Sequence, residues 1–430
     1  MIIANQNLPQ FTPILLGSDI NAYGFARSFY EITHQPVEAY AEVPLAATRY
    51  SKIINMNFYK GFTADPVFIE TMRSVAQKYA HQSQPLVLLA MGDGYAELIA
   101  KHREELAQTF ICPGVDYALL RRLNNKESFY QVCDQYHLPH PKTKIITRAM
   151  YEKKTDLTVP FEFPVVLKPA NSVEWLQIDF KGRKKAFTLH AQADYENIVA
   201  QIYDHGYQSD LILQEFIPGD DSHMRVLNAY VDQHHHVKMM CLGHPLLEDP
   251  TPQSIGNYVA ILPEYNQKVY DQLQKFLEDI EYTGFANFDM KFDDRDQEFK
   301  LFEINLRPGR SSFYVTLNGY NLAQLVVDDY VTQTLDNQDT VYGNKNKAQH
   351  QLWLGVTNGV FKKYALENRY KEDALELLRQ DRVGTTLLYK GDLGLRRWLL
   401  VNYLYYQYRG RFKQYFEENK GQYIKSEAKE

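Results

Sequence analysis

The sequence predicts a mixed α/β and α+β protein of two or three domains that begins with a Rossmann-like layer. Two short apolar runs near the N-terminus each end at a glycine and lead into a helical pattern, and two later alternating runs predict a β-hairpin. The chain has 430 residues, of which 45% are hydrophobic and 23% charged, so it can bury more than one core.

The first domain is predicted over residues 1–115. One apolar run, 11–17, passes through a polar turn into a helical pattern at 22–32, and a second, 86–91, leads into a helical pattern at 95–106. Strands that alternate with helices, with glycine at the carboxyl end of the strand, are typical of a parallel sheet whose loops face a ligand crevice. Neither glycine turn completes the dinucleotide-binding pattern, so no such site is expected.

A second domain of mixed α+β character is predicted over residues 116–330, with a lid subdomain at about 163–218. Its predicted strands and one helix are separated by turn residues, and they cover 163–169, 211–217, 224–231, 238–242 and, for the helix, 266–280. Three adjacent histidines, 234–236, lie at a turn. Because adjacent side chains on a strand point to alternate sides, we do not expect them to bind a metal together.

The third region, 331–430, is predicted as a helical extension that ends in basic and aromatic residues. Between Leu395 and Tyr415 there are four arginines and a lysine, interleaved with aromatic side chains, and no acidic residue. Two interpretations stay open: a packed helix whose basic ends reach solvent, or a peripheral contact with an anionic membrane surface.

Composition narrows the function class. The formal net charge of -6 argues against a generic nucleic-acid binder. The three cysteines, Cys112, Cys133 and Cys241, are odd in number and far apart, which indicates buried thiols in a reducing compartment. No signal peptide or membrane span is visible, so we expect a cytoplasmic protein.

The most informative segment is the predicted hairpin. Residues 285–292 alternate with period two, a polar turn follows at 293–297, and 299–305 resume the alternation. A turn centred near Asp296 would place carboxylates and amides of the two strands opposite one another on one face.

In that register Asp289 faces Glu303 and Asn287 faces Asn305. Two close carboxylates repel unless a cation or a proton lies between them, so the pair is either a metal site or an acid pair with a raised pKa. The all-oxygen donor set favours Mg²⁺, whereas zinc would usually recruit His or Cys. A hairpin with a solvated polar face is the alternative.

Phosphoryl chemistry also needs cations, and four basic residues are candidates. Arg307 and Arg310 follow the hairpin, Lys126 lies upstream, and Lys168 ends an apolar strand just before a proline. Taken alone, a single lysine is more commonly a surface residue.

The segment from Gln214 to Gly219 is a candidate adenine site. Its backbone and Glu215 would face the adenine edge, with Asp220 or Asp221 near the ribose. Taken alone, this segment predicts only a strand and a turn.

In this order the pieces resemble the ATP-grasp superfamily over roughly residues 116–330. The most specific element is Glu303-x-Asn305-x-Arg307-x-x-Arg310, which looks like the metal and phosphate element of carbamoyl-phosphate-synthetase-type members. One departure is the lid loop, which is often glycine-rich in the family, whereas 170–185 contains a single glycine, Gly182.

The resemblance implies ATP and Mg²⁺ as cofactors and gives the candidate residues their roles. Nucleotide contacts are implied for Lys126, Lys168, Gln214, Glu215, Ile217 and Asp221. Magnesium would be bound by Asp289, Glu303 and Asn305. Catalytic contacts to the phosphoryl group or the carboxylate that receives it are implied for Arg307, Arg310 and Lys168.

Most of the chain is similar to the D-aspartate ligase family of low-GC Gram-positive bacteria. The similar segments are 11–28, 45–52, 65–72, 92–98, 163–173, 216–231, 241–258 and 282–317. This resemblance implies a ligase that joins the β-carboxylate of D-aspartate to the lysine ε-amine of the UDP-MurNAc-pentapeptide precursor of peptidoglycan. Preference for the D substrate rests on the resemblance alone.

An amino-acid substrate needs partners for its second carboxylate and its amino group. Arg310, Arg27 and Arg49 are candidates for the carboxylate, and Ser18 and Asp19, after the first strand, for the amino group. Two alternatives remain: an ATP-grasp ligase with another acid and amine, and a catalytically silent ATP-binding module that docks on membrane.

Overall fold

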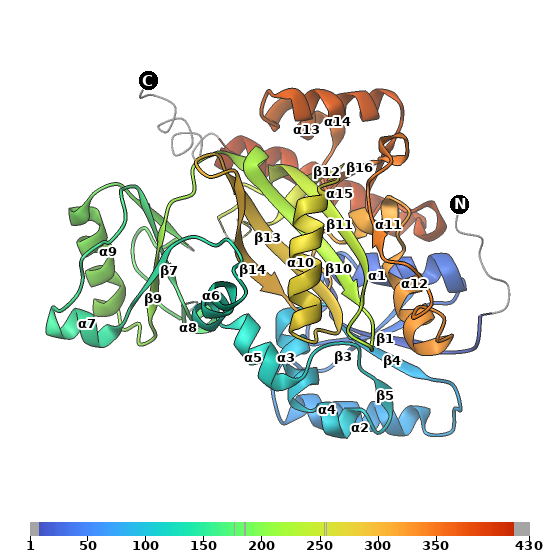
Figure 1. Cartoon of the computed structure of the whole chain (residues 1–430). Helices are drawn as coiled ribbons and strands as arrows, with labels where there is room; N and C mark the ends of the chain where they lie inside the picture. Colours follow the sequence, from blue (N-terminus) through green and yellow to red (C-terminus); the bar gives the residue numbers. More distant parts are fainter. Residues whose placement is uncertain (1–7, 176, 185, 253, 255, 417–430) are drawn as a thin grey trace.

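The computed structural model describes residues 8–416 except 176, 185, 253 and 255 (Figure 1). Within this part of the chain the strands form three sheets, of five, four and eight strands. The five-stranded sheet is N-terminal, and the four-stranded sheet projects to one side. The eight-stranded sheet lies between it and the C-terminal helices (Figure 1).

The N-terminal sheet is parallel throughout, with strand order β3-β2-β1-β4-β5. Its strands are β1 (Thr12–Leu16), β2 (Val37–Ala41), β3 (Ile54–Phe58), β4 (Leu86–Ala90) and β5 (Phe110–Ile111). Its helices are α1 (Ile20–Thr33), α2 (Val67–Tyr79), α3 (Asp93–Lys101) and α4 (Arg103–Leu106). The predicted Rossmann-like layer is confirmed. The strand order reverses between β1 and β4, which is where open parallel sheets bind ligands.

The predicted bounds of the helix over 95–106 were wrong. It begins earlier, at Asp93, and is interrupted at His102. There the His102 ring lies 2.9 Å from a carboxylate oxygen of Asp65, which also pairs with Lys101. The partner comes from a loop that lies far away in sequence, and apolar spacing carries no signal of it.

The eight-stranded sheet is mainly antiparallel, in the order β14-β13-β10-β11-β12-β16-β17, and β15 pairs with β11. Its strands are β10 (Met224–Val231), β11 (Val237–Glu248), β12 (Tyr258–Glu264), β13 (Gly284–Asp293), β14 (Glu298–Asn305), β15 (Val341–Tyr342), β16 (Leu352–Leu354) and β17 (Val383–Gly384). This sheet therefore receives its last three strands from the C-terminal region.

Helices bury both faces of this sheet. On one face α10 (Gln267–Asp279) packs Tyr270 and Phe276 against Leu227. On the other face α1 packs with α11 (Phe313–Leu317) and α12 (Leu322–Val326), and Phe25 touches Phe285 with ring centroids 5.3 Å apart. The N-terminal layer and the central sheet thus share one core, and their strand ends are held together.

The four-stranded sheet is antiparallel, in the order β6-β9-β7-β8. It consists of β6 (Thr143–Ile146), β7 (Val165–Pro169), β8 (Phe187–Leu189) and β9 (Leu211–Glu215), with α7 (Arg148–Lys153), α8 (Ser172–Trp175) and α9 (Gln192–Asp204) around it. Two helices, α5 (Tyr117–Asn124) and α6 (Lys126–Gln135), lead into it. The sheet takes in β6, ahead of the segment predicted as the lid. The domain limits themselves stay a prediction.

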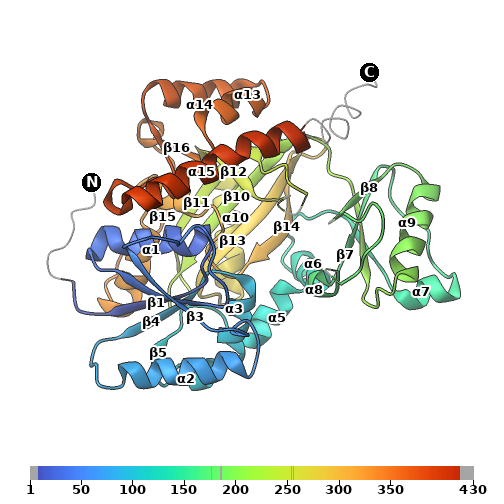
Figure 2. The ribbon, with the colours of Figure 1, turned by 180° about the vertical axis from the view of Figure 1, so that it is seen from behind.

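The C-terminal region contributes α13 (Asn358–Tyr364), α14 (Arg369–Arg379) and α15 (Leu395–Arg411). Figure 2 shows α15 crossing the surface of the molecule beside α1. Its inner side joins a small core of Tyr23, Ala47 and Ile53 from the N-terminal layer with Val401 and Tyr405. Among the described residues, no helix is both long and apolar enough to span a bilayer.

Candidate active site

The hairpin β13–β14 has the predicted register. Asp289 pairs with Glu303 and Asn287 with Asn305, and a bulge follows Asp289. The alternation along each strand then puts all four polar side chains on one face. The cross-strand pairing inferred from period and turn position is confirmed.

Burial and a neighbouring carboxylate both act on Asp289. Burial is the larger cause and the charge of Glu303 the smaller one of a shift that raises the pKa of Asp289 to about 7. The charge of Arg307 opposes this shift. The Asn305 amide donates to Asp289 at 3.3 Å, and the Tyr258 hydroxyl of β12 also bonds to this carboxylate. A half-buried carboxylate pair with an amide beside it is a donor set that suits Mg²⁺.

Arg307 connects the end of β14 to the N-terminal layer. Its guanidinium donates to Asp93 Oδ2 at 2.9 Å and to Asn305 Oδ1 at 3.2 Å. Its Nε is buried and has no hydrogen-bond partner among the described residues. Because Asp93 follows β4, the guanidinium lies at the crevice where the strand order reverses.

Asp19, at the carboxyl end of β1, completes this corner. It caps α1 by accepting from the amides of Asn21 and Ala22, each at 3.1 Å. Burial raises the pKa of the Asp19 carboxyl, and the nearby charges of Arg310 and Arg307 oppose that rise. Arg310 itself is exposed and has no hydrogen bond or ion pair within the described part of the chain. The ends of β1, β4 and β14 therefore meet at one place.

Gly309 sets the close approach of the loop to the hairpin. A Cβ at this position would come within 2.8 Å of the Asn287 side chain. The Asn21 amide donates to the Pro308 carbonyl at 2.8 Å, which ties the same loop to α1. The loop that carries Arg307 and Arg310 is thus fixed from both sides.

The segment predicted to bind adenine lies where the four-stranded sheet joins the central sheet. Lys291, on β13, donates to the carbonyls of Ile217 and Gly219. Burial lowers the pKa of Lys291 to about 8, against the opposing charge of Asp221. Burial, with the charge of Asp220, raises the pKa of Asp221 to about 6. Lys291 therefore connects the backbone of this segment, through hydrogen bonds, to the strand that carries Asp289.

Two side chains predicted at the adenine edge are engaged elsewhere. Gln214 is buried and donates to Thr143 Oγ1 at 2.8 Å. Glu215 accepts from the Lys142 amide at 2.9 Å and pairs with Arg295 at 3.2 Å. Because these two side chains bond elsewhere, the backbone of 214–219 is the part of this segment that can face adenine.

The predicted phosphate lysines lie on the side of the four-stranded sheet. Lys168, on β7, has its ammonium 5.8 Å from the ring centroid of Phe302 on β14. Lys126 is the first residue of α6. The contact with Phe302 brings β7 over the hairpin.

The other three predicted substrate residues have different surroundings. Ser18 donates to the Val43 carbonyl at 2.7 Å. The Arg27 guanidinium packs on Phe313 and Tyr389 and pairs with Glu31 at 2.8 Å. Arg49 has an exposed side chain. Among these four candidates, Asp19 is the one that interacts electrostatically with Arg307 and Arg310.

Sequence reasoning missed Asp93, Tyr258 and Lys291. Lys291 lies two residues after Asp289, on the same face of the strand, so strand periodicity could have found it. Asp93 begins helix α3 and Tyr258 begins strand β12, and neither leaves a local signal.

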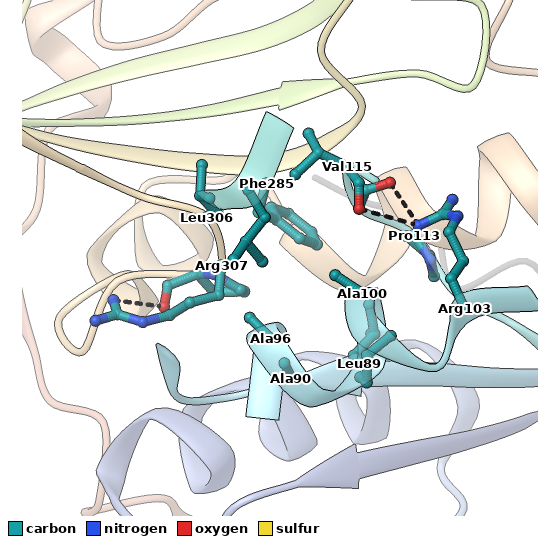
Figure 3. Close-up of a pocket in the computed structure, with 14 residues that line it drawn as sticks. Leu89, Ala90, Ala96, Ala100, Arg103, Pro113, Val115, Phe285, Leu306 and Arg307 are labelled. Atoms are coloured by element: carbon teal, nitrogen blue, oxygen red, sulfur yellow. Dashed lines mark hydrogen bonds between the residues drawn. The ribbon is translucent and has the colours of Figure 1, made fainter. Parts of the chain in front are cut away.

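Figure 3 shows a small cavity beside Arg307, lined by Leu89, Ala96, Phe285 and Leu306 among others. Its volume is about 30 Å³, and much of its lining is apolar. It has space for about one water molecule, so it cannot hold a nucleotide.

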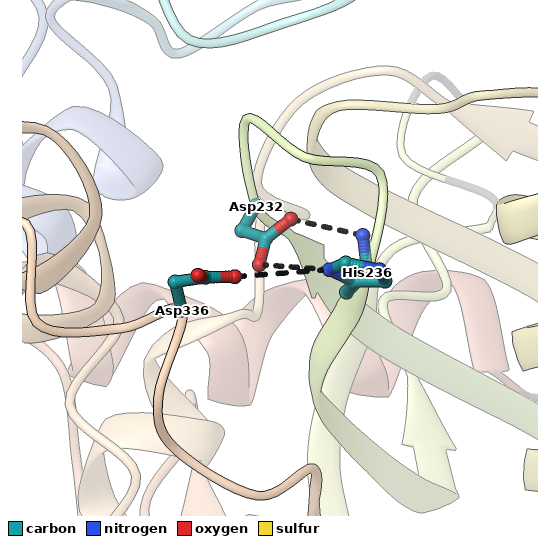
Figure 4. Close-up of side chains that lie close together, drawn as sticks. All are labelled: Asp232, His236 and Asp336. Carbon is teal, nitrogen blue, oxygen red and sulfur yellow. Dashed lines mark hydrogen bonds and ion pairs between the residues drawn. The ribbon is translucent and has the colours of Figure 1, made fainter.

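A second polar cluster lies at the β10–β11 turn (Figure 4). The Nδ1 atom of His236 is 3.8 Å from Asp232 and 3.9 Å from Asp336. The Lys238 ammonium lies 3.6 Å from the same Asp232 oxygen, and the other Asp232 oxygen accepts two backbone amides of the turn. Lys238 supplies the positive charge here, and the cluster stabilises the turn.

A relative with high sequence similarity defines the family. A D-aspartate ligase of Enterococcus faecium (strain Aus0004) is 55% identical over 414 residues, which cover 96% of this chain and 98% of that protein. The chain belongs to the D-aspartate ligase family. A scan against protein-family models found no match.

Solved structures agree on the fold. The L-amino acid ligase of Bacillus licheniformis matches with a TM-score of 0.54 and 13% identity, over 77% of each chain. The biotin carboxylase domain of Hydrogenobacter thermophilus 2-oxoglutarate carboxylase, solved with MgADP, ADP and bicarbonate, matches with a TM-score of 0.56 and 12% identity. That match covers 78% of this chain and 72% of the domain. This member of the D-aspartate ligase family therefore has the ATP-grasp fold.

Proposed function

We propose that this chain uses ATP and Mg²⁺ to activate the β-carboxylate of D-aspartate and joins it to the lysine ε-amine of UDP-MurNAc-pentapeptide. The observation that carries the proposal is the 55% identity to a D-aspartate ligase over 96% of the chain. The carboxylate would attack the γ-phosphate of ATP to give an acyl phosphate and ADP, and the neutral amine would then displace phosphate. Both substrates would be met on the cytoplasmic side of the membrane.

The metal would be held by Asp289, Glu303 and Asn305. The raised pKa of Asp289 and its pairing with Glu303 support the assignment, because a cation would relieve the repulsion between two close carboxylates. When bound, Mg²⁺ supplies charge neutralisation on the phosphate oxygens.

Arg307 would bind the phosphoryl group or the carboxylate that receives it. It already lies between Asp93 and Asn305, so its guanidinium is positioned before substrate arrives. Lys126 and Lys168 would approach the phosphates from the four-stranded sheet. The Ile217 segment, fastened by Lys291, would hold adenine, with Asp221 near the ribose.

D-Aspartate would bind where β1 and β4 end. Its ammonium group suits Asp19, and its α-carboxylate suits Arg310, which is exposed and near Asp19. Asp19 and Arg310 are the favoured pair, because Ser18 and Arg27 already bond to other groups of the protein. Arg49 is exposed on the surface.

An ADP-release assay tests the reaction. We expect turnover with D-aspartate plus a lysine-containing muramyl precursor, and far less with L-aspartate, D-asparagine or without the precursor. Turnover with a different amino acid and none with D-aspartate would identify another acid and overturn the assignment.

Glu303→Gln tests the metal site. The loss of one carboxylate charge should lower ADP release by roughly two orders of magnitude or more, because several kcal/mol of charge stabilisation are removed. Glu298→Gln is the matched control, since Glu298 is on the same strand but pairs with exposed Lys268. Equal activity of the two variants would contradict the metal assignment.

A further inference from the structure

The outward side of α15 carries an apolar stripe. Leu395, Leu399, Tyr403 and Tyr406 follow one another at spacings of four, four and three residues, which places them on one face of the helix. Leu395 is 75% exposed and Tyr406 63%. Trp398 lies beside the stripe and is 48% exposed. Large apolar side chains rarely gather on the surface without a partner.

This stripe is not needed to hold the helix in place. The inward side of α15 carries Arg397, Val401 and Tyr405, which are buried. Arg397 pairs with Asp392 at 2.9 Å and lies over the Tyr23 ring at 4.1 Å. The helix therefore has apolar residues on two sides, and its outer side is presented on a fixed support.

The charged side chains that α15 and the turn after it carry are all positive. Between residues 395 and 416 there is no acidic residue, although the whole chain has a net charge of -6. Arg396, Arg409 and Lys413 are exposed on this helix and the turn that follows it. A local positive charge on an acidic protein is complementary to an anionic surface.

A neighbouring loop contacts the inward side of α15. The Arg397 guanidinium donates to the carbonyls of Ala47 and Arg49, which holds the loop against α15. Three apolar side chains of this loop are exposed, and they are Val43, Leu45 and Tyr50. The loop therefore holds α15 from its inward side, while the stripe on its outer side stays exposed.

We propose that the outer side of α15 docks on the surface of a bilayer that contains anionic phospholipids. Leu, Trp and Tyr side chains enter the boundary between headgroups and acyl chains, and Arg and Lys bind the headgroups. The helix lies in the plane of the interface.

Vesicle sedimentation of the full chain tests this proposal. We expect the protein to sediment with equimolar phosphatidylcholine–phosphatidylglycerol vesicles, to remain in solution with phosphatidylcholine alone, and to be released by salt. Substituting Arg396, Arg409 or Lys413 by Gln should weaken binding about fivefold per residue. The control pair Lys362→Gln and Lys363→Gln, exposed on α13, should not change it.

The apolar part is tested with the triple variant Leu395→Ser, Leu399→Ser and Tyr403→Ser. It should lose vesicle binding but keep its unfolding temperature and its ADP release with the soluble precursor. Protein that stays in solution with anionic vesicles, or a triple variant that still sediments, overturns the proposal. A concentration-dependent dimer that only the triple variant abolishes would instead show that this face joins two copies.

Discussion

Arg397→Met removes the buried cation beneath α15 and should destabilise the protein by about 3–5 kcal/mol. Both side chains of the Arg397–Asp392 pair are fully buried, at 0% exposure, and lie 2.9 Å apart. After the change Asp392 would remain a buried carboxylate without its cation. It would keep hydrogen bonds from Tyr23, Ser51 and the Lys52 amide, which favours the lower end of the range.

Urea unfolding followed by tryptophan fluorescence measures the loss, because Trp398 lies on the same helix. Arg396→Met is the matched control, since Arg396 is exposed and should change stability by no more than about 0.5 kcal/mol. The double variant with Asp392→Asn should lose much less than the two single losses combined. A loss below about 1 kcal/mol for Arg397→Met, or additive single losses, would refute the reasoning.

Three further predictions follow from contacts near the candidate site. Lys291→Met removes an ammonium that holds two backbone carbonyls, so the KM for ATP should rise by roughly tenfold or more, and an unchanged KM would count against it. Gly309→Ala places a Cβ 2.8 Å from Asn287 and should cost about 1–3 kcal/mol. Gly359→Ala, whose Cβ would lie in open space and which, like Gly309, is not at positive φ, is the control in thermal unfolding. Burial would raise the pKa of Glu264, but bonds to His244 and Arg225 outweigh it and bring the pKa to about 2. Since this pKa lies below the usual 4.5, the contribution of about 3 kcal/mol is present above pH 4.5 and is lost as pH falls toward 2. Acid titration of Glu264→Gln should therefore show a smaller loss of stability in this window than the unchanged chain, and parallel curves would contradict it.

The hairpin could be predicted from the sequence because its register depends only on residues close together in the chain. Period two in both strands and a polar turn determine which residues are opposite, and Asp289 and Glu303 are paired as expected. The strand predicted at 238–242 was too short, because β11 continues through Pro245 to Glu248. Irregular pairing around Pro245 and Leu247 accommodates the proline, and this depends on β12 rather than on local sequence.

The rest of the site depends on distant partners. Arg307 and Asp93 are 214 positions apart, and the Tyr258 hydroxyl reaches Asp289 from β12. No spacing rule connects such residues, because their approach follows from how the two sheets pack. For the same reason the sequence alone could not decide whether α15 packs against the protein or contacts a membrane. The structure shows that one side of the helix is buried and the other exposes apolar side chains.

The small core shared by Tyr23, Ile53, Val401 and Tyr405 also bears on how the chain folds during synthesis. The N-terminal layer can form its five strands early, but one side of α1 stays uncovered until the last tenth of the chain has been made. Contacts between such distant residues form late and slow folding. A nascent chain that stalls before α15 would therefore expose an aromatic surface on a layer that is otherwise complete, which is a site for chaperones to bind.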